Sequence, residues 1–212
     1  MSDDWYRRKT WTETDQEEFL ARLGRCRKQA NKAQYLRIQA LHLEEKYPAA
    51  SLELLQRIIS EFPDHFELAQ TYVQMARCQI ALSDPDAAVL SFRKALAREV
   101  EFPSMLTHAY LDFPVFVVVN DRRDLFPEVD ALLSEHASRL TFPVDHYKFN
   151  MCRALIADHR GDSTSASQHA TAALSAAAEQ HSGFRYHPEV GLVKKQDKTI
   201  QKKLAALAAA QQ

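Results

Sequence analysis

The chain has 212 residues, a formal net charge of −1 and only four glycines, and 46% of its residues are hydrophobic. The nearly balanced charge argues against general nucleic-acid binding, because that requires a basic surface which releases counterions from the phosphate backbone. The scarcity of glycine argues against hairpin-rich β folds, whose tight turns need residues that adopt positive φ.

The first part of the chain is predicted to be a head segment, residues 1–14, followed by an N-terminal helix, residues 15–31. Thr14 and Glu17 have the spacing of a capping box, which marks the start of a helix. Apolar residues then recur at the spacing of one helical face. They are Phe19, Leu23, Cys26 and Ala30.

Residues 32–180 are predicted to form about four antiparallel helical hairpins. The pair Phe-Pro recurs every 40 residues, at Phe62-Pro63, Phe102-Pro103 and Phe142-Pro143. Proline interrupts helices, and a period of this length is typical of stacked helical hairpins. After a first hairpin with its turn at Tyr47-Pro48, the others pair residues 67–82 with 86–99, 104–119 with 126–140, and 146–159 with 163–179.

Two segments fit this pattern less directly. Val115–Val119 is apolar and rich in valine, as in a buried strand, but a lone strand leaves its backbone groups unsatisfied, so a helix is predicted. Residues 181–196 hold two of the four glycines and are predicted to form an ordered loop. Residues 197–210 follow as a C-terminal helix. The whole chain, residues 1–212, is therefore predicted to be a single all-α domain.

The second hairpin resembles the tetratricopeptide repeat. The residues that carry the resemblance are Tyr72, Met75, Ala76, Ala88, Phe92 and Ala95. Ala76 and Ala88 fall where the two helices of such a repeat cross, and small side chains there let the backbones approach. The resemblance covers roughly residues 32–178 and implies a right-handed array of stacked hairpins, with one extra helix at each end.

The other hairpins match this signature less fully. The fourth keeps a Gly161-Asp162 turn, the first has Ser51 where alanine is expected, and the third lacks most of the pattern. The chain is also similar to a group of bacterial proteins, with no known activity, that place a Trp-aromatic-Arg head before such repeats. The matching segments are Trp5–Trp11 and Gly183–Pro188.

Two aromatic and cationic segments are secondary candidates for binding. They contain Trp5, Arg7, Arg8 and Trp11 in the head, and Phe184, Arg185, Tyr186 and His187 in the loop. Aromatic residues interleaved with cations can stack on bases or clamp phosphates. They can equally cover the open end of a repeat array, since a terminal repeat must shield its apolar face. The loop aromatics can likewise pack against the last hairpin.

The resemblance also implies a concave groove lined by the first helix of each hairpin. The residues carried over to it are Leu36, Arg37, Val73, Arg77, Met151 and Leu155. An apolar stripe with arginines at its side suits an apolar or amphipathic peptide segment. The competing occupant is the chain's own C-terminal helix, through Ile200, Leu204 and Leu207.

Catalytic and metal-binding patterns are absent from the sequence. There is no HExxH, CxxC, phosphate-cradling glycine loop or nucleophile elbow, so no catalytic residue, cofactor or metal is predicted. Cys26, Cys78 and Cys152 lie far apart among apolar or helical neighbours, which predicts buried, reduced thiols. The acidic start of the chain does not resemble a signal peptide, and no apolar run reaches membrane-spanning length.

The sequence therefore predicts a cytoplasmic adaptor or regulatory protein that binds another protein or peptide and catalyses no reaction. Three alternatives remain open. They are a dedicated inhibitor or immunity protein for a toxin or effector, nucleic-acid binding through the Trp5–Trp11 head, and an enzyme whose site no motif reveals. The partner's identity and the oligomeric state do not follow from the sequence.

Overall fold

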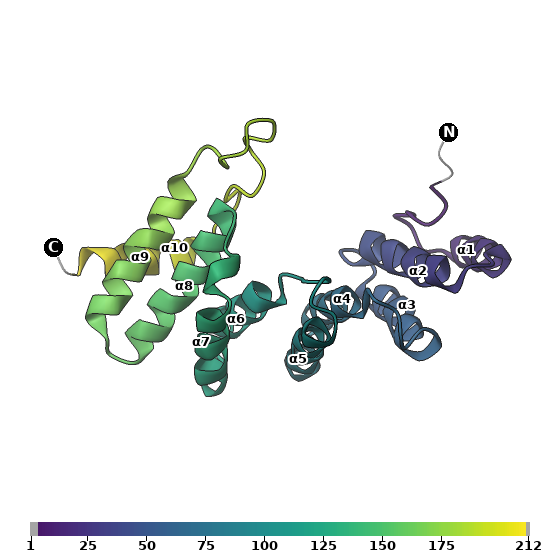
Figure 1. The fold of residues 1–212 in the computed structure, drawn as a ribbon, viewed down its shortest axis with the longest axis horizontal. Helices are drawn as coiled ribbons and strands as arrows, with labels where there is room; N and C mark the ends of the chain where they lie inside the picture. The colour runs from purple at the N-terminus through teal and green to yellow at the C-terminus, as the bar shows by residue number, and fades with distance from the viewer. Residues whose placement is uncertain (1–3, 211–212) are drawn as a thin grey trace. The chain divides into compact units, whose positions relative to one another are not determined.

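The computed structural model describes residues 4–210, and every regular element within this range is a helix (Figure 1). The elements are α1 (Glu13–Arg25), α2 (Gln29–Leu43), α3 (Pro48–Glu61), α4 (Leu68–Ala81), α5 (Pro85–Glu101), α6 (Ala109–Val119), η1 (Arg123–Leu125), α7 (Phe126–Glu135), η2 (Ala137–Arg139), α8 (Pro143–His159), α9 (Ser163–Ala178) and α10 (Lys198–Ala209). The all-α prediction is confirmed, including a helix over Val115–Val119. Among these residues, no helix has both the length and the apolar character needed to cross a bilayer.

The contacts of the chain divide it into two compact units, the first ending at Ala109 and the second beginning at Tyr110. In the first unit, α2 packs on α3, α3 on α4, and α4 on α5. In the second unit, α8 packs on α9, and α10 contacts both of them. A single domain was predicted from the sequence, whereas the contacts group the helices into two units.

Small residues lie buried in the paired helices of the first unit. Ala76 of α4 and Ala88 of α5, which were predicted to lie at a helix crossing, are both fully buried. Ser51 occupies the corresponding place in α3, where it is also fully buried. Its hydroxyl donates to the carbonyl of Ala40 at 2.9 Å and accepts from the thiol of Cys78 at 3.2 Å. Serine therefore replaces alanine here without leaving an unpaired hydroxyl.

The helices α4, α6 and α8 end in the same way. Each is followed by a residue in the left-handed conformation: Ser83 with φ 61°, Asp121 with φ 51° and Gly161 with φ 76°. The next backbone N–H then donates to a carbonyl five residues back, as in a Schellman motif. The bonds are Asp84 N to Gln79 O at 2.8 Å, Arg122 N to Val117 O at 3.0 Å, and Asp162 N to Ala157 O at 3.0 Å. The chain thus repeats a turn, as well as a sequence pattern.

The Phe-Pro pairs do not mark the same place in each repeat. Phe62 and Phe102 directly follow α3 and α5, whereas Phe142 directly precedes α8. Proline fits both the first turn of a helix and the position just beyond its end. Of the three Phe-Pro pairs that recur every 40 residues, two therefore lie at the end of a helix and one lies at the start of a helix.

The N-terminal helix begins and ends earlier than predicted. Its capping box uses Thr12 and Asp15, because the Thr12 hydroxyl accepts from Asp15 N at 3.2 Å and the Asp15 carboxylate accepts from Thr12 N at 3.0 Å. The predicted helix over residues 15–31 is interrupted between Arg25 and Gln29, where α1 ends and α2 begins. Three Thr-x-x-acid patterns overlap here, beginning at Thr10, Thr12 and Thr14, and the second of them forms the cap.

Two of the three cysteines are buried. Burial raises the pKa of the Cys78 thiol to about 11 and that of the Cys152 thiol further still. Cys26 is only half-buried, because it forms the C-cap at the exposed end of α1. The prediction of three buried thiols is therefore wrong for Cys26.

Replacing Ala88 with leucine should lower the free energy of unfolding by about 1–3 kcal/mol, because the added side chain overpacks a closed helix contact. Ala97→Leu, on the exposed side of the same helix, provides the control and should change stability little. Chemical denaturation followed by circular dichroism measures both. An Ala88→Leu variant as stable as the wild type would contradict the packing described here.

Candidate functional site

The four apolar residues of the predicted groove are core residues. Leu36, Val73, Met151 and Leu155 are each 5% exposed or less. The two arginines beside them are engaged in ion pairs. Arg37 lies 3.2 Å from a Glu67 carboxylate oxygen, and Arg77 lies 3.6 Å from one of Glu44. An exposed apolar stripe at these positions is therefore a wrong prediction, because neighbouring helices cover the face that was expected to be open.

The C-terminal helix is part of the packing of the second unit. Leu204 of α10 is fully buried, and Lys203 lies 2.9 Å from the carboxylate of Asp158 on α8. Leu155 and Ile200 line the same small cavity of about 130 Å³ between the helices of this unit. The sequence left two possible occupants for the helix face that carries Met151 and Leu155: a partner's peptide segment and the chain's own C-terminal helix. The packing of α10 agrees better with the second.

The aromatic rings of the head pack inward on the first unit. The Trp5 ring lies 5.0 Å from the Tyr35 ring and 5.4 Å from the Phe19 ring, measured between centroids. The Trp11 ring lies 5.6 Å from Phe19. Since Phe19 is fully buried, these contacts extend the core of the unit to the head. Two roles were predicted for the head, a binding surface and a cap over the apolar end of the helices. The inward packing of its rings corresponds to the cap.

Polar contacts fix the head backbone as well. Arg8 lies 2.6 Å from the Asp15 carboxylate and also pairs with Glu18. The buried side chain of Gln39 donates to the carbonyl of Arg8 at 2.8 Å and accepts from its N–H at 3.0 Å. Arg7 has the more exposed guanidinium of the two. No pattern in the sequence singled out Gln39, because its role depends on a segment 31 residues away.

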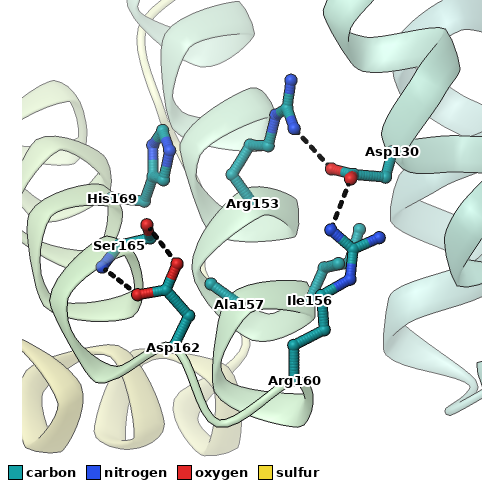
Figure 2. A pocket seen from close by; sticks show the side chains of 8 residues that line it. All are labelled: Asp130, Arg153, Ile156, Ala157, Arg160, Asp162, Ser165 and His169. Carbon is teal, nitrogen blue, oxygen red and sulfur yellow. Dashed lines mark hydrogen bonds and ion pairs between the residues drawn. The ribbon is translucent and has the colours of Figure 1, made fainter.

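A small charged pocket of about 120 Å³ lies within the second unit (Figure 2). It is lined by Asp130, Arg153, Ile156, Ala157, Arg160, Asp162, Ser165 and His169. Asp130 of α7 pairs through its two oxygens with Arg153 of α8 and with Arg160, the residue that follows α8, the latter at 2.7 Å. Arg153 also donates to the Ser134 hydroxyl. The network thus connects α7 to α8 with its charges paired.

Ser165 and His169 lie one turn apart on α9, yet they have different hydrogen-bond partners. The Ser165 hydroxyl donates to Asp162 at 2.6 Å within the N-cap of α9, and this bond lowers the pKa of that carboxyl. His169 Nδ1 lies 2.9 Å from the side-chain oxygen of Asn150. A serine nucleophile would direct its hydroxyl toward a base. No group of three potential metal ligands occurs among residues 4–210.

A loop between α9 and α10, here called the contact loop (Ser182–Gly191), is closed at its base. The N–H of Ser182 donates to the carbonyl of Pro188 at 2.8 Å, and its hydroxyl donates to the carbonyl of His187 at 2.7 Å. The same hydroxyl accepts from the N–H of Phe184 at 3.2 Å. One serine therefore organises both arms of the loop.

Gly191 anchors the far end of the contact loop on the start of α8. Its carbonyl accepts from the N–H of Val144 at 2.8 Å, and its φ is 69°. A Cβ at this position would lie 2.4 Å from the side chain of Phe142. Only glycine therefore fits the close approach between the loop and Phe142.

The tip of the contact loop points two aromatic residues toward solvent. Tyr186 is 79% exposed, and the Arg185 guanidinium lies 5.5 Å from the centre of its ring. Phe184 is 44% exposed and packs on Phe142 with 5.3 Å between ring centroids. The prediction that the loop aromatics pack against the last hairpin thus holds in part for Phe184 and fails for Tyr186.

An open hollow of about 490 Å³ borders the base of the contact loop. Its walls come from α8, α9 and the residues that follow α9. They are Thr141, Pro143, His146, Asn150, Ala172, Ser175, Ala176, Glu179, His181, Ser182 and Gly183. The hollow touches the contact loop through Ser182 and Gly183.

No protein-family model matches the chain, and neither the curated proteins nor the solved structures contain a match. The resemblance to tetratricopeptide repeats therefore stays a prediction from the residues. Its physical counterparts in the structure are the buried Ala76 and Ala88 and the repeated helix-ending turns.

Replacing Gly191 with alanine should lower the free energy of unfolding by about 1–3 kcal/mol, since the new Cβ combines a strained positive φ with a clash. Gly24→Ala is a matched control, because nothing lies within 4 Å of its would-be Cβ. That variant should be neutral or slightly stabilising, as alanine favours a helix. Equal stability of the two variants would contradict the anchoring of the loop.

The stability of the second unit should decrease as the pH falls below about 6.5, the ordinary pKa of histidine. Burial, reinforced by the charge of Arg153, lowers the pKa of His169. The unfolded chain therefore takes up this proton more readily than the folded chain, so the stabilising contribution is complete above the ordinary pKa and is lost in acid. His169→Gln should flatten the dependence in thermal unfolding at several pH values. An unchanged slope would exclude His169 as its source.

Proposed function

We propose that this protein is a cytoplasmic adaptor of the tetratricopeptide-like type that binds another protein through the contact loop. The main support is that Tyr186 is exposed, with Arg185 over its ring, at the tip of a loop. Hydrogen bonds of Ser182 hold the base of that loop. The proposal keeps the predicted class of function but places the binding residues in the loop between α9 and α10. The helix faces that carry Leu36 and Met151 have no part in it.

The chemistry of the loop tip is that of a protein-binding surface. Tyrosine and arginine are enriched among the residues that contribute most to protein–protein affinity. A loop held by Ser182 and Gly191 is already ordered, so binding costs less conformational entropy than it would for a free segment. The hollow beside the base of the loop offers further hydrogen-bonding groups, such as His146 and Asn150, as at the rim of an interface.

The repeated helix-ending turns also support the proposal. The shared turns at Ser83, Asp121 and Gly161 and the buried alanines fit an array of stacked hairpins. Such arrays present loops and faces for binding other proteins. The right-handed sense of the array is part of the proposal. A reducing compartment such as the cytoplasm suits the three free cysteines.

The alternative functions have less support. Nucleic-acid stacking by the head would need free ring faces, whereas Trp5 and Trp11 are packed against Phe19. A catalytic role for Ser165 and His169 would need a hydrogen bond between their side chains. Ser165 instead donates to Asp162, and His169 lies within hydrogen-bond distance of Asn150. A dedicated inhibitor of a toxin or effector would use the same kind of surface and is a narrower form of the proposed function.

Affinity capture with the whole chain as bait tests the proposal. The double variant Arg185→Ala/Tyr186→Ala should lose about tenfold or more of the captured partner, because it removes the exposed anchors. Leu90→Ala, which alters an exposed apolar residue of the first unit, should capture as much partner as the wild type. Thermal unfolding establishes that both variants are folded. Undiminished capture by the double variant would refute binding through this loop.

A further inference from the structure

A second open surface lies in the first unit, where the start of α2 meets the turn after α3. It is a hollow of about 460 Å³, here called the aromatic hollow. It is lined by Gln29, Ala30, Glu61, Phe62, Pro63, Asp64, His65 and Phe66. Phe66 is 46% exposed and stacks on His65, with 4.6 Å between the ring centroids. Its volume is sufficient for apolar side chains of a bound segment.

The chain segment that leads to one wall of this hollow is strongly basic. From Phe19 to Leu43 the chain has no acidic residue and six cations. The cations are Arg22, Arg25, Arg27, Lys28, Lys32 and Arg37. Arg27 and Lys28 immediately precede Gln29 and Ala30 in the wall of the hollow, and both are exposed. Neither of them has an ion pair with any residue in the described range 4–210.

The start of α2 does not favour these two cations, whereas the end of α1, two residues before Arg27, does. Lys28 is the N-cap of α2 and makes no capping hydrogen bond, and the first turn of α2 contains no acidic residue. A positive charge at the N-terminus of a helix is unfavourable, because the helix dipole is positive there. Neither cation is neutralised within the described part of the chain, so both can meet an anionic group that approaches from outside.

The opposite wall of the hollow offers little compensation. Glu61 pairs with Arg57 at 2.7 Å, and Glu67, next to Phe66, pairs with Arg37 at 3.2 Å. Asp64 is the wall's one carboxylate without an ion pair in the described part of the chain. The surface therefore combines apolar walls with an excess of unpaired positive charge along one edge.

We propose that the aromatic hollow binds an acidic, amphipathic segment of a partner protein. An apolar side chain of that segment inserts between Phe62 and Phe66, while its carboxylates lie near Arg27 and Lys28. The inference rests on the proposed protein-binding function, but it concerns the other unit and different residues. Apolar anchors with charged neighbours are the usual pattern when a groove takes an amphipathic helix.

Fluorescence anisotropy with the full chain tests this proposal. The probe is a labelled amphipathic peptide with leucines at helical spacing and glutamates elsewhere, and its counterpart has lysines instead. The glutamate peptide should bind, with an affinity that falls as salt is raised. Phe66→Ala and Arg27→Glu/Lys28→Glu should each weaken binding about tenfold. Leu41→Ala, which replaces a residue of the same 46% exposure on α2, is the matched control and should bind as the wild type does.

Three results would overturn the proposal: equal binding of the lysine peptide, unchanged affinity of Phe66→Ala, or no binding of the glutamate peptide. The Arg185→Ala/Tyr186→Ala variant separates the two surfaces, because it should bind the glutamate peptide normally. Loss of peptide binding in that variant would place the peptide on the contact loop and refute the hollow. If only partner capture through the contact loop fails, the proposed function falls while peptide binding at the hollow persists.

Discussion

The fold depends on how closely paired helices can approach each other. Fully or almost fully buried small residues occur in both units, on both helices of a pair: Ser51, Ala76 and Ala88 in the first, and Ala154, Ala166 and Ala170 in the second. Larger side chains at such contacts would push the backbones apart and leave voids beside them. The close approach in turn allows the short connections in which Ser83 and Gly161 adopt positive φ.

Tight pairing also determines where partners can bind. Helix faces that would be open in a looser array are closed by neighbours, so Leu36 and Val73 contribute to stability instead of recognition. Connections held on a rigid scaffold remain accessible, and binding residues are commonly found in such places. The contact loop and the aromatic hollow are both of this kind, each within its own unit.

The sequence predicted local structure better than exposure. Helical spacing identified the buried Phe19 and Leu23 of α1, but the same spacing describes a core and a groove, so Met151 and Leu155 were misplaced. The Val115–Val119 helix was predictable because an isolated strand has no backbone partners. Gln39 and the fit of Gly191 against Phe142 were not predictable, since both depend on segments that are distant in the chain. The loop tip was a secondary candidate on composition alone, through its aromatic and cationic residues.

The central claim is that recognition by the second unit takes place at a preformed loop and not along helix faces. Hydrogen–deuterium exchange of the chain, alone and with its captured partner, tests this claim most directly. Binding should slow exchange at the amides of the contact loop, Ser182–Gly191, and at the adjoining ends of α8 and α9. Protection that runs along the length of α8 around Met151 and Leu155, with the contact loop unchanged, would contradict the account.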